Sequence, residues 1–169
     1  MEIRVLSEDD LEDYTELRLR ALKEEPEAFG ASYEESSKLS REEVADRLAC
    51  SDDGFILGAF DESTGLLLAM VGFYRNRPAK MKHKGAVWGM YTVPEARGLG
   101  VGRALMVELI DRAKVIDGLE TLLITVVVEN KAAYKLYKSL GFKEYAIECG
   151  ALKVDDKYLD EAFMSMPLS

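Results

Sequence analysis

The sequence predicts an α/β domain of the α+β type, with four helices packed on a mixed, mostly antiparallel sheet of about six to seven strands. Two observations support this prediction. Short strand-like runs joined by turn sequences occur early and late in the chain, as in antiparallel hairpins. Between them, a glycine-rich turn and an amphipathic helix connect apolar runs at 86–93 and 121–128, the pattern of a parallel βαβ unit. At 169 residues, the chain is expected to form one domain over 1–169.

Each element has a local signal. The acidic segment 7–10 is expected to cap the first helix, and Ser40 with Glu43 forms a capping-box pattern that opens the second. Asn130 and Gly141 should cap the two ends of the last helix. The expected strands are 2–7, 55–60, 66–74, 86–93, 121–128, 142–152 and 158–168, and the third helix covers 100–116.

Composition excludes several classes of function. The formal charge is −9, from 31 acidic and 22 basic side chains, so the overall field repels nucleic acid and anionic membranes and attracts a cationic acceptor. No apolar run is long enough to span a bilayer and no signal peptide is visible, which favours a soluble, cytoplasmic protein. We therefore expect no nucleic-acid partner and no membrane partner.

The cysteines and the histidine do not form a reactive or metal-binding cluster. Cys50 and Cys149 are far apart and lack metal-site spacing, so we expect no metal and no disulfide, with both thiols reduced and buried. The lone histidine, His83, lies in a basic segment that is typical of a solvated loop rather than of a catalytic centre.

The turn between the strand at 86–93 and the following helix is the strongest functional signal. It reads Arg-Gly-Leu-Gly-Val-Gly-Arg over residues 97–103. Alternating glycines let the backbone approach a ligand and direct several amides to one point, and the helix start adds partial positive charge. The dinucleotide fingerprint and the P-loop both fail on spacing. The segment is therefore predicted to bind a diphosphate, and a ligand-free tight turn is the alternative.

Two motifs together resemble the GNAT superfamily of acyl-CoA-dependent N-acetyltransferases. The family pattern Arg/Gln-x-x-Gly-x-Gly/Ala falls on Arg97, Gly100 and Gly102, and residues 130–142 resemble the second signature. The resemblance is specific from about residue 86 to residue 142. It implies a GNAT-like fold in which the parallel strands splay apart, and acetyl-CoA as co-substrate without a metal.

The resemblance also implies where acetyl-CoA binds. Backbone groups of Tyr91 and Val93 should contact the pantetheine arm and the thioester carbonyl. Asn130 is first a helix cap and second a contact of the pantetheine arm. The expected diphosphate-binding residues are Arg97, Gly98, Leu99, Gly100, Val101, Gly102 and Arg103.

The catalytic acid implied by the second signature is Tyr137. A phenol is protonated at neutral pH and can donate to a departing thiolate, although a core role for this tyrosine is the alternative. No carboxylate occurs in the strand before the loop, where many relatives carry the base. Glu34, Glu35, Asp160 and Glu161 are the acidic residues that could replace it, and the sequence does not distinguish them from surface charges.

The predicted function is transfer of an acetyl group to the amine of a small molecule or peptide. A non-catalytic acyl-CoA-binding regulatory module is the alternative, and an exposed edge strand near the C-terminus would permit a homodimer. Four residues of the early loop and the strand are expected to wall the acceptor pocket: Phe29, Tyr33, Glu34 and Trp88.

Overall fold

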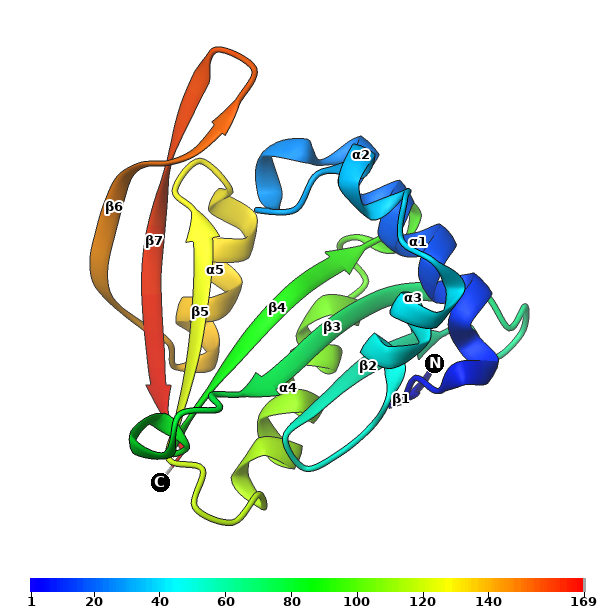
Figure 1. Cartoon of the computed structure of the whole chain (residues 1–169), viewed down its shortest axis with the longest axis horizontal. Coiled ribbons are helices and arrows are strands. Elements are labelled where there is room, and N and C mark those ends of the chain that lie inside the picture. Colours follow the sequence, from blue (N-terminus) through cyan, green and yellow to red (C-terminus); the bar gives the residue numbers. More distant parts are fainter. Residues whose placement is uncertain (169) are drawn as a thin grey trace.

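The computed structural model describes residues 1–168, and its elements follow one another in the expected order (Figure 1). The strands are β1 (Glu2–Val5), β2 (Gly54–Phe60), β3 (Leu67–Arg75), β4 (Lys84–Thr92), β5 (Thr121–Val127), β6 (Lys143–Val154) and β7 (Lys157–Pro167). The α-helices are α1 (Leu11–Glu24), α2 (Tyr33–Ser36), α3 (Arg41–Leu48), α4 (Val101–Lys114) and α5 (Lys131–Leu140). Short 3-10 turns are η1 (Glu8–Asp10), η2 (Pro26–Ala28), η3 (Ala79–Met81) and η4 (Pro94–Ala96).

One seven-stranded sheet runs through the molecule in the order β1-β2-β3-β4-β5-β7-β6. Every neighbouring pair is antiparallel except β4 and β5, which confirms the predicted mixed sheet with a parallel βαβ unit. The structure has five α-helices rather than four. The additional helix is α2, a single turn that the side chain of Ser32 caps by accepting a hydrogen bond from the Glu35 amide at 3.2 Å.

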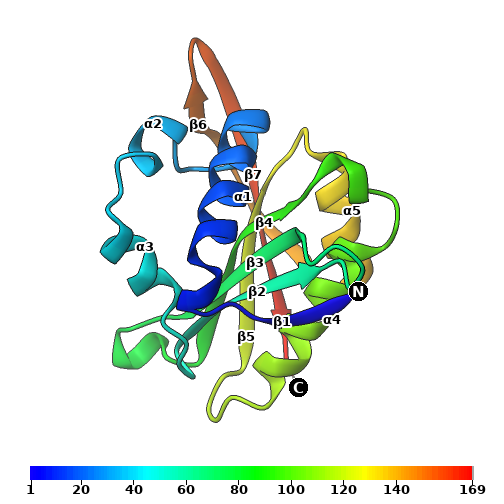
Figure 2. The same ribbon diagram turned by 90° about the vertical axis from the view of Figure 1, so that its right-hand side faces the viewer.

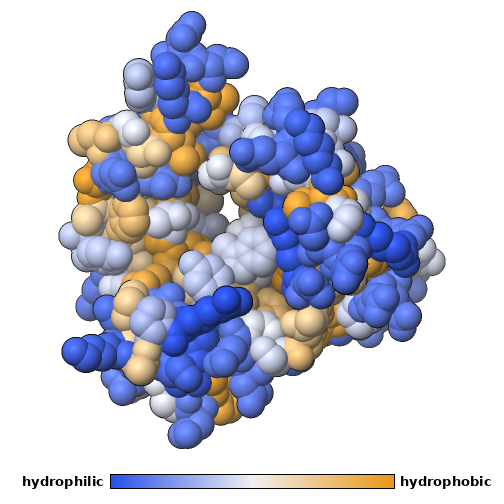
Figure 3. Space-filling view, in the orientation of Figure 1, coloured by the Kyte–Doolittle hydropathy of each residue, from blue (hydrophilic) through white to orange (hydrophobic). Residues whose placement is uncertain are grey.

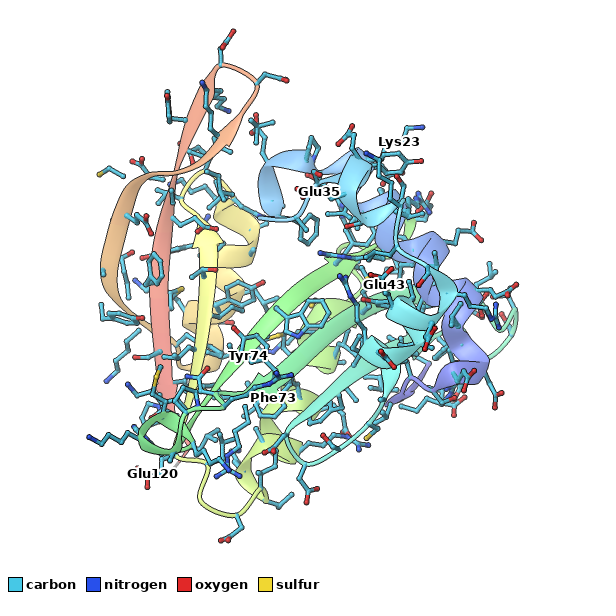
Figure 4. The ribbon with its side chains drawn as sticks, in the orientation of Figure 1. Lys23, Glu35, Glu43, Phe73, Tyr74 and Glu120 are labelled. Carbon is cyan, nitrogen blue, oxygen red and sulfur yellow. The ribbon has the colours of Figure 1, made fainter. Side chains whose placement is uncertain are left out.

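The helices cover both faces of the sheet. Figure 2 shows α1, α2 and α3 on one side and α4 and α5 on the other. Leu105, Met106 and Leu109 of α4 are fully buried, while α1 buries Leu17 and Ala21. Phe55 and the Phe73 labelled in Figure 4 are in ring contact, with centroids 5.1 Å apart, on neighbouring strands of this core. The arrangement fixes the ends of β4, α4 and α5 relative to one another.

Strands β4 and β5 pair over a short distance only. Their register covers Lys84, Gly85 and Ala86 of β4, opposite residues 121–123, and ends there. Further along β4, Gly89 has a φ of 65° and the register with β3 shifts, so the strand bulges away from a regular ladder. Beyond residue 86, β4 and β5 are no longer hydrogen-bonded to each other. Their facing edges separate, as the resemblance implied (Figure 1).

The expectation for the two cysteines has a clear outcome. Cys50 and Cys149 are both exposed and unbridged, so the prediction that they are buried is wrong. Cys50 follows the end of α3, and Cys149 lies on β6, a strand at the edge of the sheet. Among residues 1–168, no helix has the length and apolar character that crossing a bilayer requires.

Candidate active site

A large cavity lies where β4 and β5 separate. It has a volume of about 990 Å³ and opens between the β5–β7 side of the molecule and the helical side, where Figure 3 shows a deep hollow. Its walls come from β4, β5, the turn before α4, the start of α5 and the segment after α1. At the rim, Lys157 of the β6–β7 hairpin contacts both carboxylate oxygens of Glu27 at 3.1 Å. The cavity is large enough for a cofactor arm and a small acceptor.

The glycine-rich turn presents a row of free amides to one end of this cavity. Gly98 and Gly100 have φ angles of 77° and 81°, in the left-handed region that glycine tolerates, and Gly100 is the N-cap of α4. From Gly98 to Arg103, no amide donates to an acceptor within residues 1–168, whereas the next one, Ala104, donates to the Gly100 carbonyl at 3.0 Å. Consecutive free amides at a helix start form an anion-binding site.

Gly102 holds this turn against β4. A Cβ atom at this position would lie 2.9 Å from the Met90 Cε atom and 3.2 Å from the Thr92 Oγ1 atom. A side chain at residue 102 would therefore require the Met90 side chain to move and the Thr92 hydroxyl to give way. The glycine keeps the row of amides next to the open edge of β4.

The two arginines of the turn have different surroundings. The Nη2 atom of Arg97 lies 3.0 Å from the Oε1 atom of Glu25, and the Nε atom of Arg97 donates to the Thr92 carbonyl at 3.1 Å. Arg103 donates to the Ser139 hydroxyl at 2.8 Å and has no carboxylate partner within residues 1–168. Both line the cavity, but the charge of Arg97 is already neutralised in part.

Tyr137 lies on α5 with its side chain directed into the core and the cavity. It is 5% exposed, packs edge-on against Phe142 with centroids 6.2 Å apart, and lines the cavity. Burial raises the pKa of the Tyr137 phenol well above its ordinary value. The phenol therefore stays protonated at neutral pH and is a proton donor. Tyr137 therefore packs in the core and also lines the cavity.

Three other predicted cofactor residues differ in what they can offer. Asn130 caps α5 by accepting from the Ala133 amide at 3.2 Å, and it also lines the cavity. Tyr91 lines the cavity with a phenol that donates to Glu24 at 2.5 Å, and burial with this bond raises its pKa to about 12. The Val93 amide donates to the Leu68 carbonyl and the Val93 carbonyl accepts from Ala96, so neither group is free.

Four predicted residues do not line the cavity: Val93, Leu99, Tyr33 and Glu34. Val93 is buried behind β4, and the Leu99 side chain is 76% exposed on the outside of the turn. Tyr33 and Glu34 lie on the α2 turn, which places them in solvent. Their neighbour Glu35, labelled in Figure 4, is also exposed on α2, where it accepts from the Ser32 hydroxyl at 3.0 Å. The unpredicted helix α2 thus explains why this segment does not reach the site.

The opposite end of the cavity is walled by aromatic residues and by one arginine that was not predicted from the sequence. Phe29 and Trp88, the aromatic residues expected to wall the acceptor pocket, both line it. Arg18 of α1 lies between them, with its guanidinium 4.9 Å from the Phe29 ring centroid and 5.9 Å from that of Trp88. The position follows Tyr14 by one helical turn, so it falls on the buried stripe of α1. A charged residue on an apolar stripe was the signal that could have identified it.

Of the acidic residues lining the cavity, Glu161 of β7 differs from the rest. Glu25 and Glu27 pair with Arg97 and Lys157, and Glu129 is exposed. Glu161 is partly buried without a basic partner among residues 1–168, and burial, with the nearby Glu148 carboxylate, raises its pKa. The other candidate on that strand, Asp160, accepts from the Gly150 amide at 2.8 Å and does not line the cavity.

Comparison with known proteins agrees with this geometry. The sequence profile of the acetyltransferase (GNAT) family matches residues 11–142. An uncharacterised N-acetyltransferase of Methanocaldococcus jannaschii is 28% identical over 153 residues, 90% of this chain and 65% of that protein. The [ribosomal protein bS18]-alanine N-acetyltransferase of Escherichia coli is 38% identical over 76 residues, 45% of this chain and 51% of that protein. The chain therefore spans between half and two thirds of the length of these relatives.

Solved structures share the fold along nearly the whole chain. A GNAT-family acetyltransferase from Streptococcus pneumoniae superposes with a TM-score of 0.90 at 23% identity, covering 99% of both chains. The yncA protein of Salmonella typhimurium, solved with its cofactor acetyl-CoA, gives a TM-score of 0.86 at 22% identity and covers 100% of this chain and 94% of its own. At such identities the likeness establishes the fold. The profile match over most of the domain, on a fold with splayed parallel strands, identifies the chain as a member of the GNAT acetyltransferase family.

Proposed function

We propose that this protein transfers an acetyl group from acetyl-CoA to the amine of a small molecule or peptide by direct attack. The observation that carries the proposal is the row of free amides from Gly98 to Arg103 at the start of α4, opening on the cavity between β4 and β5. Amides at a helix start suit a diphosphate, and the open strand edges offer donors and acceptors to an extended amide-containing arm. The family supports the same activity in general terms.

The residues of the cavity have separate tasks in this proposal. Acetyl-CoA, when bound, supplies the activated thioester and a thiol leaving group. The amides from Gly98 to Arg103 hold its diphosphate, with Arg103 as the less neutralised of the two arginines. Open backbone groups of β4 beside Tyr91 hold the pantetheine arm, and an amide there that faces the thioester oxygen would stabilise developing charge by about 3 kcal/mol.

Two side chains move the protons. The amine nitrogen forms a bond to the acyl carbon as the carbon–sulfur bond breaks, and Tyr137 donates a proton to the departing sulfur. Glu161 accepts the proton that the amine loses, because it is the partly buried carboxylate of the cavity without a cationic partner in residues 1–168. Its raised pKa makes it a stronger base than an exposed glutamate.

The proposal is tested by incubating the protein with acetyl-CoA and a panel of amines and peptides. Free thiol and a mass gain of one acetyl group on an acceptor are expected together. If acetyl-CoA binds and no acceptor is modified, the chain is instead an acyl-CoA-binding regulatory module, for which the lack of a carboxylate on β4 is the supporting observation. If acetyl-CoA does not bind, both candidates fail.

A further inference from the structure

Arg18 is a buried cation without a counter-ion. It is 8% exposed, and its Nε and Nη1 atoms are both buried without a hydrogen-bond partner in residues 1–168. No carboxylate in that range pairs with it, although the chain carries 31 acidic side chains. Leaving a buried charge unpaired is costly, so evolution would replace it with an apolar residue unless the charge had a use.

The surroundings of Arg18 keep its charge available to the cavity. Burial lowers its pKa, and the nearby positive charge of Arg47 lowers it further, while the Tyr14 phenol acts in the opposite direction. A guanidinium nevertheless remains protonated at neutral pH. The rings of Phe29 and Trp88 hold it in place by contacts with their faces. These contacts orient the guanidinium and leave its N–H donors unused.

Gly89 of β4 lies next to Arg18. Gly89 has a φ of 65° at the bulge of β4, and a Cβ atom there would lie 3.7 Å from the Arg18 Nη1 atom. That distance is an ordinary van der Waals contact, so it is the positive φ, and not the guanidinium, that favours glycine at residue 89. The amide row at residues 98–103 belongs to a different wall, formed by the turn before α4, while Arg18 belongs to α1.

From this arrangement we infer that the acceptor carries a carboxylate as well as an amine, and that Arg18 binds this carboxylate. The inference rests on the proposed acetyltransferase function and narrows its acceptor to amino acids in free form. A planar guanidinium pairs with a carboxylate through parallel hydrogen bonds, so a small movement of Arg18 toward the cavity would give its unpartnered donors an acceptor. Glu161 in the same cavity would receive the proton of the amine.

The zwitterionic form of such an acceptor also suits the charge of the protein. A purely anionic ligand would be repelled by the net charge of −9, whereas an amino acid with a protonated amine has no net charge. The acidic residues around the cavity attract its amine end and Arg18 attracts its carboxylate end. The two groups together fix one orientation of the acceptor.

The test compares the common L-amino acids with their primary amides as acceptors in the presence of acetyl-CoA. The amides have less basic amines and are more nucleophilic at neutral pH, so a preference for the acids cannot come from amine basicity. We expect kcat/KM for the favoured acid to exceed that of its amide by about 10- to 100-fold, the range for a hydrogen bond to a charged group. Arg18→Met should abolish this ratio, and Arg18→Lys should keep part of it.

Arg41→Met is the matched control, because Arg41 is an exposed arginine of α3 whose partner is Glu12 and which does not line the cavity. It should leave the acid-to-amide ratio unchanged. The melting temperature of Arg18→Met should not fall, because the substitution removes an unpaired buried charge and keeps an apolar side chain of similar length. A purely structural role for Arg18 predicts a large loss of stability with an unchanged ratio.

The outcomes separate the inference from the proposed function. Equal use of acids and amides, a preference for peptides, or an equal loss of turnover for all acceptors in Arg18→Met would overturn the inference while leaving acetyl transfer intact. Titration of the CoA-saturated protein with the same amino acids gives a readout without turnover. Heat of binding that Arg18→Met removes, in a protein that acetylates no acceptor, would support the carboxylate site and refute the proposed function.

Discussion

At the scale of single residues, Tyr137 combines core packing with a polar group that faces the cavity. Its edge contact with Phe142 fixes the ring, and burial keeps the hydroxyl protonated. A tyrosine on the apolar face of α5 is compatible with a structural or a catalytic role from sequence alone, and the lining of the cavity favours the second.

Tyr137→Phe removes the hydroxyl and keeps the ring. We expect kcat to fall by about 100-fold or more, because general acids contribute roughly that factor, with little change in the affinity for acetyl-CoA. Steady-state kinetics and calorimetric binding measure the two effects. Tyr134→Phe is the control, because Tyr134 is on the same helix and its phenol donates to Glu144 of β6 at 2.8 Å. An equal loss of kcat in both variants would argue against Tyr137 as the general acid.

Glu161 gives a prediction about pH. Because its pKa is raised, it becomes an effective base only above that raised pKa, and activity should fall as pH decreases through it. Glu161→Gln should remove this acidic limb and lower kcat by about 100-fold for an acceptor whose amine has a low pKa. Asp160→Asn, on the neighbouring position outside the cavity, should keep the wild-type profile. Unaltered kcat in Glu161→Gln would assign the base elsewhere.

At the scale of elements, the turn between β4 and α4 would bind the diphosphate of the proposed cofactor with backbone groups rather than with side chains. Its amides converge only while Gly98 and Gly100 keep positive φ angles. The following helix α4 is anchored by its buried residues, and Gly85, Val87 and Tyr91 of the preceding strand are buried, so both ends of the turn are attached to the core.

Gly100→Ala tests this turn. A Cβ in the left-handed region costs roughly 1–2 kcal/mol, so the turn should rearrange and KM for acetyl-CoA should rise by about tenfold or more. Gly65→Ala is a matched control, because Gly65 has a φ of 72° in an exposed hairpin turn and, as at Gly100, an added Cβ atom would meet no other atom within 4 Å. Both variants should lose similar stability in chemical denaturation, and only Gly100→Ala should lose cofactor affinity.

Elements with strong local signals were predicted from the sequence, whereas a one-turn helix and an ion pair between distant residues were not. The capping box at Ser40 and the left-handed Gly141 place α3 and the end of α5 correctly. Helix α2 is one turn long and has no apolar periodicity, so the segment of Tyr33 and Glu34 was expected to reach the cavity. The ion pair between Arg97 and Glu25 could not be predicted from the sequence either, because the two residues lie 72 positions apart in the chain.

At the scale of the molecule, the amide row, the strand gap and the helical wall form one cavity that crosses the sheet. The net charge of −9 is unfavourable for a ligand as anionic as CoA, so the proposed binding of CoA would depend on the free amides and on Arg103. CoA should therefore stabilise the folded chain, and most of this stabilisation should depend on its diphosphate.

A thermal unfolding experiment checks this coupling. At 100 times the dissociation constant, CoA should stabilise the fold by about 2.7 kcal/mol, which corresponds to a rise in melting temperature of roughly 5–10 °C for a chain of this size. Pantetheine, which lacks the diphosphate, should give a much smaller rise at the same concentration. No shift with CoA would refute a cofactor site of any kind.

The short pairing of β4 with β5, three residues long, has one further consequence. The sheet has two parts, β1–β4 and β5–β7, which are hydrogen-bonded to each other only through the paired residues at one end of β4 and β5. An extended ligand inserted where these strands separate would form hydrogen bonds with the unpaired edges of β4 and β5, as an additional strand between them would. Amides along the open edges of both parts should then exchange slowly with solvent only when the ligand is bound.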